Sequence, residues 1–410
     1  MRAMTHPRLQ HRLPTGVPLR FGSVVLTTTL LSAMTLTASA PADATPLADT
    51  IRLPVIPSRL DDGQSCTRKS DEKAPSLPWA QKSLGLTRTW PVASGDGVTV
   101  AVVDTGVSQG APPLGRRVTA VAGGGTDCVG HGTFVAGLIA AGPTKGVRFA
   151  GVAQGARLIG VRGTDERGVA TDATVAAGIR AASDAGADII EVSPALVRRS
   201  GPLREAVSNA VARDALIVAA AVPDAPQRSA QTAPPPQDYW PAAEPGVLSV
   251  VDIDAKGARP QNALVPRSAD LAAPGDGVVG IGPEGTGHFI GSGASLAAAY
   301  VSGIAALVRS AHPGLSAAAT AERLTATAYP ADVPRVDPYA AVTSVRGGSA
   351  PPRAAGDSGP VRLPSDEGGA LATRRATVLA AGGVGVALLA AWSAAIIPRG
   401  RARRWRAPGR

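Results

Sequence analysis

Three polar residues, far apart along the chain, have the side-chain types that nucleophilic catalysis needs. Asp104 directly follows an apolar run, His131 lies between two glycines, and Ser295 precedes a long alanine-rich stretch. A serine hydroxyl is a weak nucleophile unless a histidine takes its proton, and a carboxylate must orient that imidazole and stabilise its charged form. Each residue alone has a structural explanation, as a turn residue, a structural histidine or a helix cap. Their combination predicts a catalytic triad.

The segments around these residues predict the elements that position them. "GVTVAVVDTG" (97–106) is typical of a buried strand, "GHGTFVAGLIAAG" (130–142) of a helix, and 146–163 of a strand, a turn and a second strand. Strands alternate with longer helical stretches up to residue 257, which predicts a doubly wound, mostly parallel α/β sheet with helices on both faces. In such sheets the functional residues gather at the carboxyl ends of strands and at adjoining helix starts. A helix beginning at Ser295 would also direct amide N–H groups at a developing oxyanion.

The chain order Asp, His, Ser is that of the subtilisins and differs from that of chymotrypsin and the α/β-hydrolases. The blocks "VAVVDTGV", "GHGTFVAGLIAA" and "GSGASLAAAYVSGIAALV" resemble the three catalytic blocks of subtilisin-like serine peptidases. "LPWAQKSLGL", the cysteine before GHGT, "WPAAEPGVLSVVDID", "LAAPGDGV" and "VDPYAAVT" further resemble the mycosins, membrane-anchored subtilisin-like proteases associated with type VII secretion in actinobacteria. The resemblance covers roughly residues 75–343 and the pattern at both ends, and it implies a subtilisin-like three-layer fold.

The resemblance also implies a role for each triad residue. Asp104 would orient and stabilise His131, His131 would act as general base and then as general acid, and Ser295 would form the acyl-enzyme. The family's oxyanion asparagine is not found where it is expected, because Val222 and Pro223 stand there in "VAAAVPDAP". A weakened oxyanion hole is therefore expected.

Three further sequence details bear on this site. Ala294 and Ala299 depart from the family pattern around the serine, and Pro194-Ala195 interrupts the strand edge that would bind an extended peptide. Asp224 or Gln227 could supply a polar group to the oxyanion site, but an aspartate would have to be protonated to donate a hydrogen bond.

The sequences at the two ends of the chain predict export across a membrane and anchoring in it. Residues 1–44 combine arginines, the apolar run "FGSVVLTTTLLSAMTLTASA" and small-residue cleavage sites, which indicates a secretory signal peptide cleaved after Ala44. The uncharged segment 376–397 is long enough for a transmembrane helix, and the arginine-rich tail 398–410 should remain in the cytoplasm. The catalytic part would then be extracytoplasmic on a single-pass protein of the cell membrane.

Charge and composition divide the rest of the chain. Residues 1–44 carry a net charge of +3 and residues 374–410 carry +8, which leaves −1 of the total of +10 for the body, so nucleic-acid binding is not expected. The body comprises an N-terminal arm (45–78), a subtilisin-like peptidase domain (79–343) and a flexible linker rich in proline and glycine (344–375).

Cys66 and Cys128 are the two cysteines of the chain, and an oxidising compartment favours a disulfide between them, with two free thiols as the alternative. Such a bridge would tie the arm near the site, which favours a tethered segment over a removable propeptide. No cofactor fingerprint or metal cluster occurs in the sequence, so no cofactor is expected, and a structural calcium stays open.

Two functions fit these observations. The first is a membrane-anchored serine endopeptidase beside the type VII secretion membrane complex. Its substrate would be a polypeptide, for example a secreted protein. The second is a catalytically impaired protease-fold subunit that scaffolds or stabilises this complex. An acyl hydrolase of another fold is disfavoured by the chain order and by the lack of a GxSxG motif.

Overall fold

The structure is a computed structural model that describes residues 52–224, 235–261, 263–345 and 367–402. The predicted signal peptide, Gln227 and most of the predicted linker lie outside these residues. The chain divides into two compact units, the first ending at Thr343 and the second beginning at Ser344.

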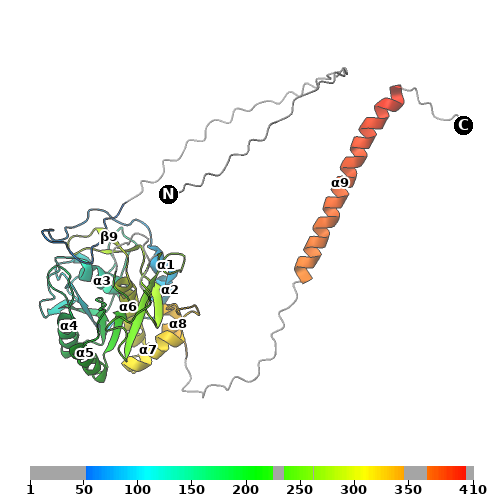
Figure 1. The fold of residues 1–410 in the computed structure, drawn as a ribbon. Helices are drawn as coiled ribbons and strands as arrows, with labels where there is room; N and C mark the ends of the chain where they lie inside the picture. Colours follow the sequence, from blue (N-terminus) through cyan, green and yellow to red (C-terminus); the bar gives the residue numbers. More distant parts are fainter. Residues whose placement is uncertain (1–51, 225–234, 262, 346–366, 403–410) are drawn as a thin grey trace, which may run out of the picture. The chain divides into compact units, whose positions relative to one another are not determined.

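A seven-stranded sheet organises the first unit (Figure 1). Its strand order is β2-β3-β1-β4-β5-β6-β7, and all neighbouring strands are parallel. The strands are β1 Thr99–Asp104, β2 Val118–Val121, β3 Arg157–Arg162, β4 Ile189–Val192, β5 Leu216–Ala220, β6 Val247–Ile253 and β7 Leu271–Pro274. The predicted parallel sheet is confirmed. Its strand order reverses beside β1, and the carboxyl end of a strand at such a point is where α/β folds place their sites.

Helices cover both faces of the sheet. The helices α3 His131–Ala140 and α6 Ala294–Ala311 pack on one face, and α4 Asp172–Asp184 and α5 Gly201–Ala212 pack on the other. Side chains of a strand alternate between the two faces, so Val102 joins the core with α3 and α6 while Val103 joins the core with α4 and α5. Burial on both faces explains why the strands are almost continuously apolar.

Smaller elements complete the first unit. The strands β8 Val278–Ile281 and β9 His288–Gly291 form an antiparallel pair, and β9 leads into α6. The remaining helices are α1 Trp79–Ser83, α2 Leu86–Thr89, the 3₁₀ turn η1 Pro112–Leu114, α7 Ala317–Ala326 and α8 Pro338–Thr343. The predicted subtilisin-like arrangement of a helix-covered parallel sheet is thus present.

One predicted strand is absent. Residues 146–152 do not pair with the sheet, and only the second strand expected within 146–163 forms, as β3. The N–H of Gly151 donates to the carbonyl of Ala141 at 2.7 Å, and the N–H of Val152 donates to that of Leu138 at 2.9 Å. The segment therefore satisfies carbonyls at the end of α3, a need that every helix end has.

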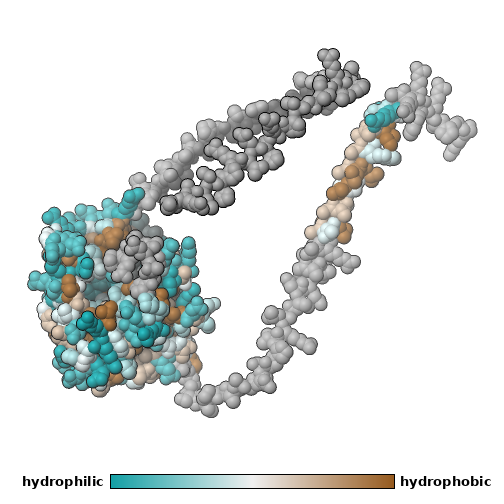
Figure 2. All heavy atoms as spheres, viewed as in Figure 1, coloured by the Kyte–Doolittle hydropathy of each residue, from teal (hydrophilic) through white to brown (hydrophobic). Residues whose placement is uncertain are grey.

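The second unit contains one long helix, α9 Glu367–Ala402. Its stretch Ala376–Arg401 is 26 residues long, is apolar enough to cross a membrane and is 0% buried in the structure. Figure 2 shows the hydrophobic side chains along this helix and the hydrophilic ones at its end. The helix α6 is also long and apolar enough to cross a membrane, but it is 83% buried, as expected of a core helix.

Candidate active site

Asp104 and His131 meet at the carboxyl end of β1. Asp104 is the last residue of this strand, and His131 is the first residue of α3. The Asp104 Oδ2 atom lies 2.7 Å from His131 Nδ1, and Asp104 Oδ1 accepts the N–H of Thr105 at 2.5 Å. Both side chains are almost completely buried. This arrangement fixes the imidazole with Nε2 directed away from Asp104.

The glycine after the histidine has a steric explanation. A Cβ atom at Gly132 would lie 2.0 Å from the carbonyl oxygen of Gly106 and 3.0 Å from the Cβ of Asp104. No side chain fits in this space, so glycine is required for the helix to approach the end of β1. Close packing against the strand that carries Asp104 thus explains the second glycine of the "GHG" pattern.

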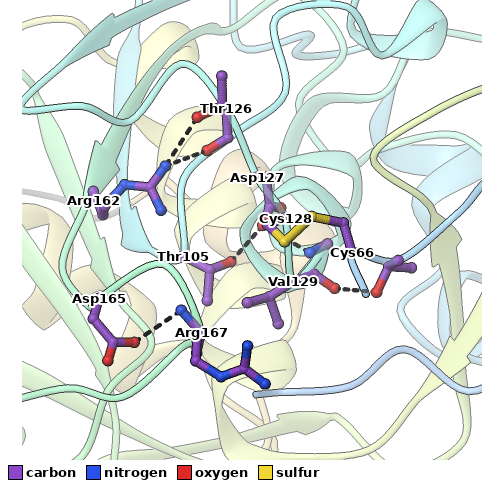
Figure 3. Close-up of a disulfide and its surroundings, with 11 residues drawn as sticks. Cys66, Thr105, Thr126, Asp127, Cys128, Val129, Arg162, Asp165 and Arg167 are labelled. Carbon is purple, nitrogen blue, oxygen red and sulfur yellow. Dashed lines mark hydrogen bonds between the residues drawn. A yellow bond between two sulfur atoms is a disulfide. The ribbon is translucent and has the colours of Figure 1, made fainter. Parts of the chain in front are cut away.

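Asp127 holds the start of α3 in place (Figure 3). Its carboxylate accepts the N–H groups of Gly130 at 2.7 Å and Thr133 at 2.8 Å, and the hydroxyls of Thr105 at 2.8 Å and Thr133 at 2.7 Å. It therefore satisfies helix N–H groups that have no partner within the helix. The sequence reasoning missed Asp127, although an acidic residue a few positions before a helix start is a recognisable capping signal.

Ser295 completes the contact with the imidazole. It is the second residue of α6, is fully buried, and its Oγ lies 3.2 Å from His131 Nε2. The structure thus brings together the three residues predicted as a triad, although 164 positions separate His131 from Ser295 in the sequence. The distances are those of a hydrogen-bonded series from carboxylate to imidazole to hydroxyl.

The carboxylate of Asp224 occupies the space beside Ser295. Its Oδ1 accepts the backbone N–H of Ser295 at 3.1 Å, while its Oδ2 accepts the Ser295 hydroxyl and lies 3.2 Å from His131 Nε2. Asp224 follows β5, and a Cβ atom at Gly293 would lie only 2.1 Å from Asp224 Oδ1. The approach of this carboxylate therefore requires glycine at position 293.

The side chain that contacts the Ser295 amide comes from one position further along the chain than expected. Val222 and Pro223 stand at the position expected for the oxyanion asparagine, but the side chain that reaches the Ser295 amide is that of Asp224. Val222 is instead buried in a small cluster with Ala220 and Ala294. An acid thus lies where an amide donor was expected, and the suggestion that Asp224 reaches this place agrees with the geometry.

A further buried acid near the triad is Glu191, on β4. Glu191 is fully buried, and its Oε1 accepts the hydroxyl of Ser193 at 2.9 Å. Within the described part of the chain, Oε2 has no hydrogen-bond partner. Burial, with the nearby charge of Asp104 as a smaller cause, raises the pKa of Glu191 well above its ordinary value. Burial therefore favours the neutral form of Glu191.

The charges of Asp104 and His131 depend on each other. Burial disfavours the Asp104 carboxylate, but the charge and hydrogen bond of His131 outweigh burial and lower the pKa of Asp104. Burial also disfavours the imidazolium, but Asp104 first and Asp224 second raise the pKa of His131 well above its ordinary value. The two neighbouring carboxyl groups therefore favour the imidazolium form of His131.

The N-terminal arm is built into the same region. The structure contains the expected disulfide between Cys66 and Cys128, three residues before His131 (Figure 3). Ile56 is buried, and its N–H donates to the carbonyl of Ile290 on β9 at 2.9 Å. Leu60 is also buried, and its N–H donates to the carbonyl of Arg167 at 2.9 Å. The described part of the arm is thus an integral layer of the first unit.

The segment after β4 has no free edge at Leu196. Its N–H and carbonyl exchange hydrogen bonds of 2.7 and 2.8 Å with Trp240. Pro194 and Ala195 precede this pair and lie outside β4, and Pro194 has no N–H to donate, so the interruption of a peptide-binding edge stays a prediction. Among the described residues, no group of three or more His, Cys, Asp or Glu side chains could hold a metal ion.

Comparisons with known proteins identify the family. Residues 95–362 match the model of the subtilase family, peptidase S8. Mycosin-3 of Mycobacterium tuberculosis is 32% identical over 405 residues, which cover 80% of this chain and 85% of mycosin-3. Thermitase of Thermoactinomyces vulgaris is 31% identical and covers 57% of this chain.

Solved structures are similar as well. The structure described as "a serine protease MycP1, an essential component of the type VII (ESX-1) secretion system" is 29% identical, has a TM-score of 0.59, and covers 72% of this chain and 100% of its own. A chain of "the periplasmic assembly from the ESX-5 inner membrane complex" is 29% identical, has a TM-score of 0.61, and covers 77% and 99% respectively. On its sequence, its sheet and its match to the family model, this chain belongs to the subtilase family and, within it, to the mycosins.

Proposed function

We propose that this protein is a membrane-anchored, extracytoplasmic serine endopeptidase associated with a type VII secretion complex. The observation that carries the proposal is the continuous contact of Asp104, His131 and Ser295, at 2.7 Å and 3.2 Å. Membership of the subtilases and the mycosins supports the reaction class. The printed descriptions of two similar structures, which name type VII and ESX secretion, support the association.

The geometry suits acyl transfer. Ser295 Oγ would attack the peptide carbonyl carbon while its proton passes to His131 Nε2, and Asp104 would stabilise the resulting imidazolium. The Ser295 backbone N–H, at the start of α6, would donate to the oxyanion. His131 would then protonate the leaving amine, and water would repeat the sequence to release the acyl group.

Active-site labelling tests this function directly. The full-length protein in detergent would be treated with a fluorophosphonate, and Ser295→Ala would serve as the matched control. We expect labelling of the wild type at Ser295 and none of the variant, with equal melting temperatures. Absence of Ser295-dependent labelling from folded wild-type protein would refute the hydrolase.

A protease-fold scaffold is the second candidate, and the Asp224 carboxylate beside Ser295 favours it. Asp224 accepts a hydrogen bond from the Ser295 amide, which would otherwise bind an oxyanion, and another from the Ser295 hydroxyl. Complementation of a deletion strain separates the two functions. Full rescue of secretion by Ser295→Ala would favour the scaffold, whereas loss of secretion with normal protein levels would favour the enzyme.

The proposed topology places the tail 398–410 in the cytoplasm and the first unit outside. The unburied apolar stretch Ala376–Arg401 and the arginines near its end support this orientation. Protease added to intact cells should digest the first unit and leave the tail protected. Protection of the first unit would refute the orientation.

A further inference from the structure

Asp224 is held at the point where the reaction would develop negative charge. Its two oxygens contact the Ser295 amide, the Ser295 hydroxyl and His131 Nε2, and only 11% of its side chain is exposed. An ionised carboxylate accepts hydrogen bonds but donates none. In this form it occupies the oxyanion site and would repel an oxyanion there.

The charged groups around Asp224 come from four elements. Asp104 on β1 is paired with His131 on α3, and burial raises the pKa of Glu191 on β4, which favours its neutral form. Asp252 on β6 accepts a hydrogen bond from Arg259, which forms an ion pair with it. The contact that Asp224 makes with a cationic group is therefore the one with His131.

The imidazolium form of His131, which its contacts with Asp104 and Asp224 favour, is also incompatible with catalysis. An imidazolium has no lone pair at Nε2, so it cannot take the proton of the Ser295 hydroxyl. With His131 as imidazolium and Asp224 as carboxylate, the base would already carry its proton and the oxyanion site would hold an anion. Transfer of one proton across the 3.2 Å from His131 Nε2 to Asp224 Oδ2 would both free the base and neutralise the carboxylate.

We propose that Asp224 and His131 share one proton, and that the reactive form is the one in which Asp224 carries it and acts as the second oxyanion donor. This inference rests on the proposed peptidase function. In the reactive form, neutral His131 is the general base, and the Asp224 hydroxyl replaces the amide donor that the family resemblance led us to expect.

The protons balance through the acylation step. As Ser295 Oγ bonds to the carbonyl carbon, the carbonyl π electrons move to oxygen and the hydroxyl proton moves to His131 Nε2. The oxyanion displaces Asp224 Oδ1 from the Ser295 N–H and accepts hydrogen bonds from that N–H and from the protonated Asp224 carboxyl. As the C–N bond breaks, His131 gives its proton to the leaving amine, and Asp224 retains its own.

The shared proton makes the reactive form dependent on pH in both directions. Acid protonates both groups, which removes the base, and alkali deprotonates both, which removes the donor. The activity should therefore follow a bell-shaped curve whose two titration steps belong to the pair. Asp224→Asn supplies a permanent amide donor and leaves His131 as the group that titrates, so its activity should rise with pH to a plateau.

The rate of fluorophosphonate labelling, measured from about pH 4 to about pH 10 on the full-length protein in detergent, tests the proposal. At the alkaline end we expect Asp224→Asn to react faster than the wild type by about 10²–10³-fold, the effect of one such donor in a related subtilisin. Asp224→Ala should also lose the alkaline decline but remain slow, because it has neither the charge nor the donor.

A second readout does not depend on activity. In protein with isotope-labelled histidine, the NMR signal of His131 should stay in its imidazolium form to higher pH in the wild type than in Asp224→Asn. Melting temperatures would establish that both variants are folded.

The outcomes separate this inference from the proposed function. Labelling of the wild type with the same pH curve in Asp224→Asn would overturn the shared proton and leave the peptidase intact. If no folded form labels at Ser295, the peptidase fails, and the NMR titration then decides whether Asp224 and His131 share a proton. An identical His131 titration in wild type and Asp224→Asn would overturn it.

Discussion

The two halves of the candidate site follow different designs. The base half, which comprises Asp104, Asp127, Cys128 and His131, is a closed network in which an acid caps the helix and a second acid orients the imidazole. The acceptor half, which comprises Asp224, Gly293 and Ser295, holds an acid beside the amide that should receive an oxyanion. The base half is therefore fixed by hydrogen bonds among its own residues, whereas the acceptor half places an acid where the proposed reaction would develop negative charge.

The largest expected effect comes from breaking the base half at Asp104. Asp104→Asn keeps the shape but donates to His131 or fixes its wrong tautomer, so the fluorophosphonate labelling rate should fall by about 10⁴-fold, as in a serine protease of another fold. Asp96→Asn, on the exposed surface, is the matched control. A nearly unchanged rate in folded Asp104→Asn would show that Asp224 alone can support His131.

The next effect concerns the disulfide that attaches the arm to the base half. Replacement of Cys66 and Cys128 by serine removes a bridge between residues 62 positions apart. In a chain-entropy model this lowers the free energy of unfolding by about 4 kcal/mol. Chemical unfolding followed by tryptophan fluorescence measures the change. An equally stable double variant would mean that the packing of Ile56 and Leu60 suffices to hold the arm.

Removal of the helix cap should cost less. Asp127→Ala leaves the N–H groups of Gly130 and Thr133 without their acceptor, and we expect the free energy of unfolding to fall by about 2 kcal/mol. The control Asp62→Ala changes an exposed aspartate and should remain within about 0.5 kcal/mol of the wild type. If both variants were equally stable, the cap would not be needed to hold the base half.

The smallest effect is a change of stability with pH at Glu191. Its pKa is raised in the folded state, so its contribution to stability is complete below its ordinary pKa and is lost as the pH rises toward the folded value. Glu191→Gln lacks this loss, so its advantage over the wild type should grow as the pH rises. Melting curves at several pH values would measure this advantage, with the exposed Glu166→Gln as control. A constant difference at all pH values would argue against a protonated Glu191.

Sequence reasoning could predict the base half more completely than the acceptor half. A strand that ends on Asp104 and a helix that begins at His131 follow from local patterns, and parallel topology brings such ends together. The side chain beside the Ser295 amide depends on how the chain turns after β5, and a shift of one residue replaces Pro223 by Asp224. Local patterns do not determine that turn.

The remaining differences also arise from long-range contacts. The predicted strand at 146–152 fails because Gly151 and Val152 bond to carbonyls of α3. The raised pKa of Glu191 could not be read from the sequence, since the elements that bury it are distant along the chain and its one hydrogen bond, from Ser193, does not offset that burial. Family resemblance placed the fold and the three triad blocks, but it carried no information about an acid that this chain places beside its nucleophile.

The glycine at position 293 controls how closely Asp224 can approach the nucleophile. A Cβ atom there would lie 2.1 Å from Asp224 Oδ1, so any larger residue requires the carboxylate to move. Position 293 therefore offers a way to displace the acid from the Ser295 amide while the residue at position 224 stays an aspartate.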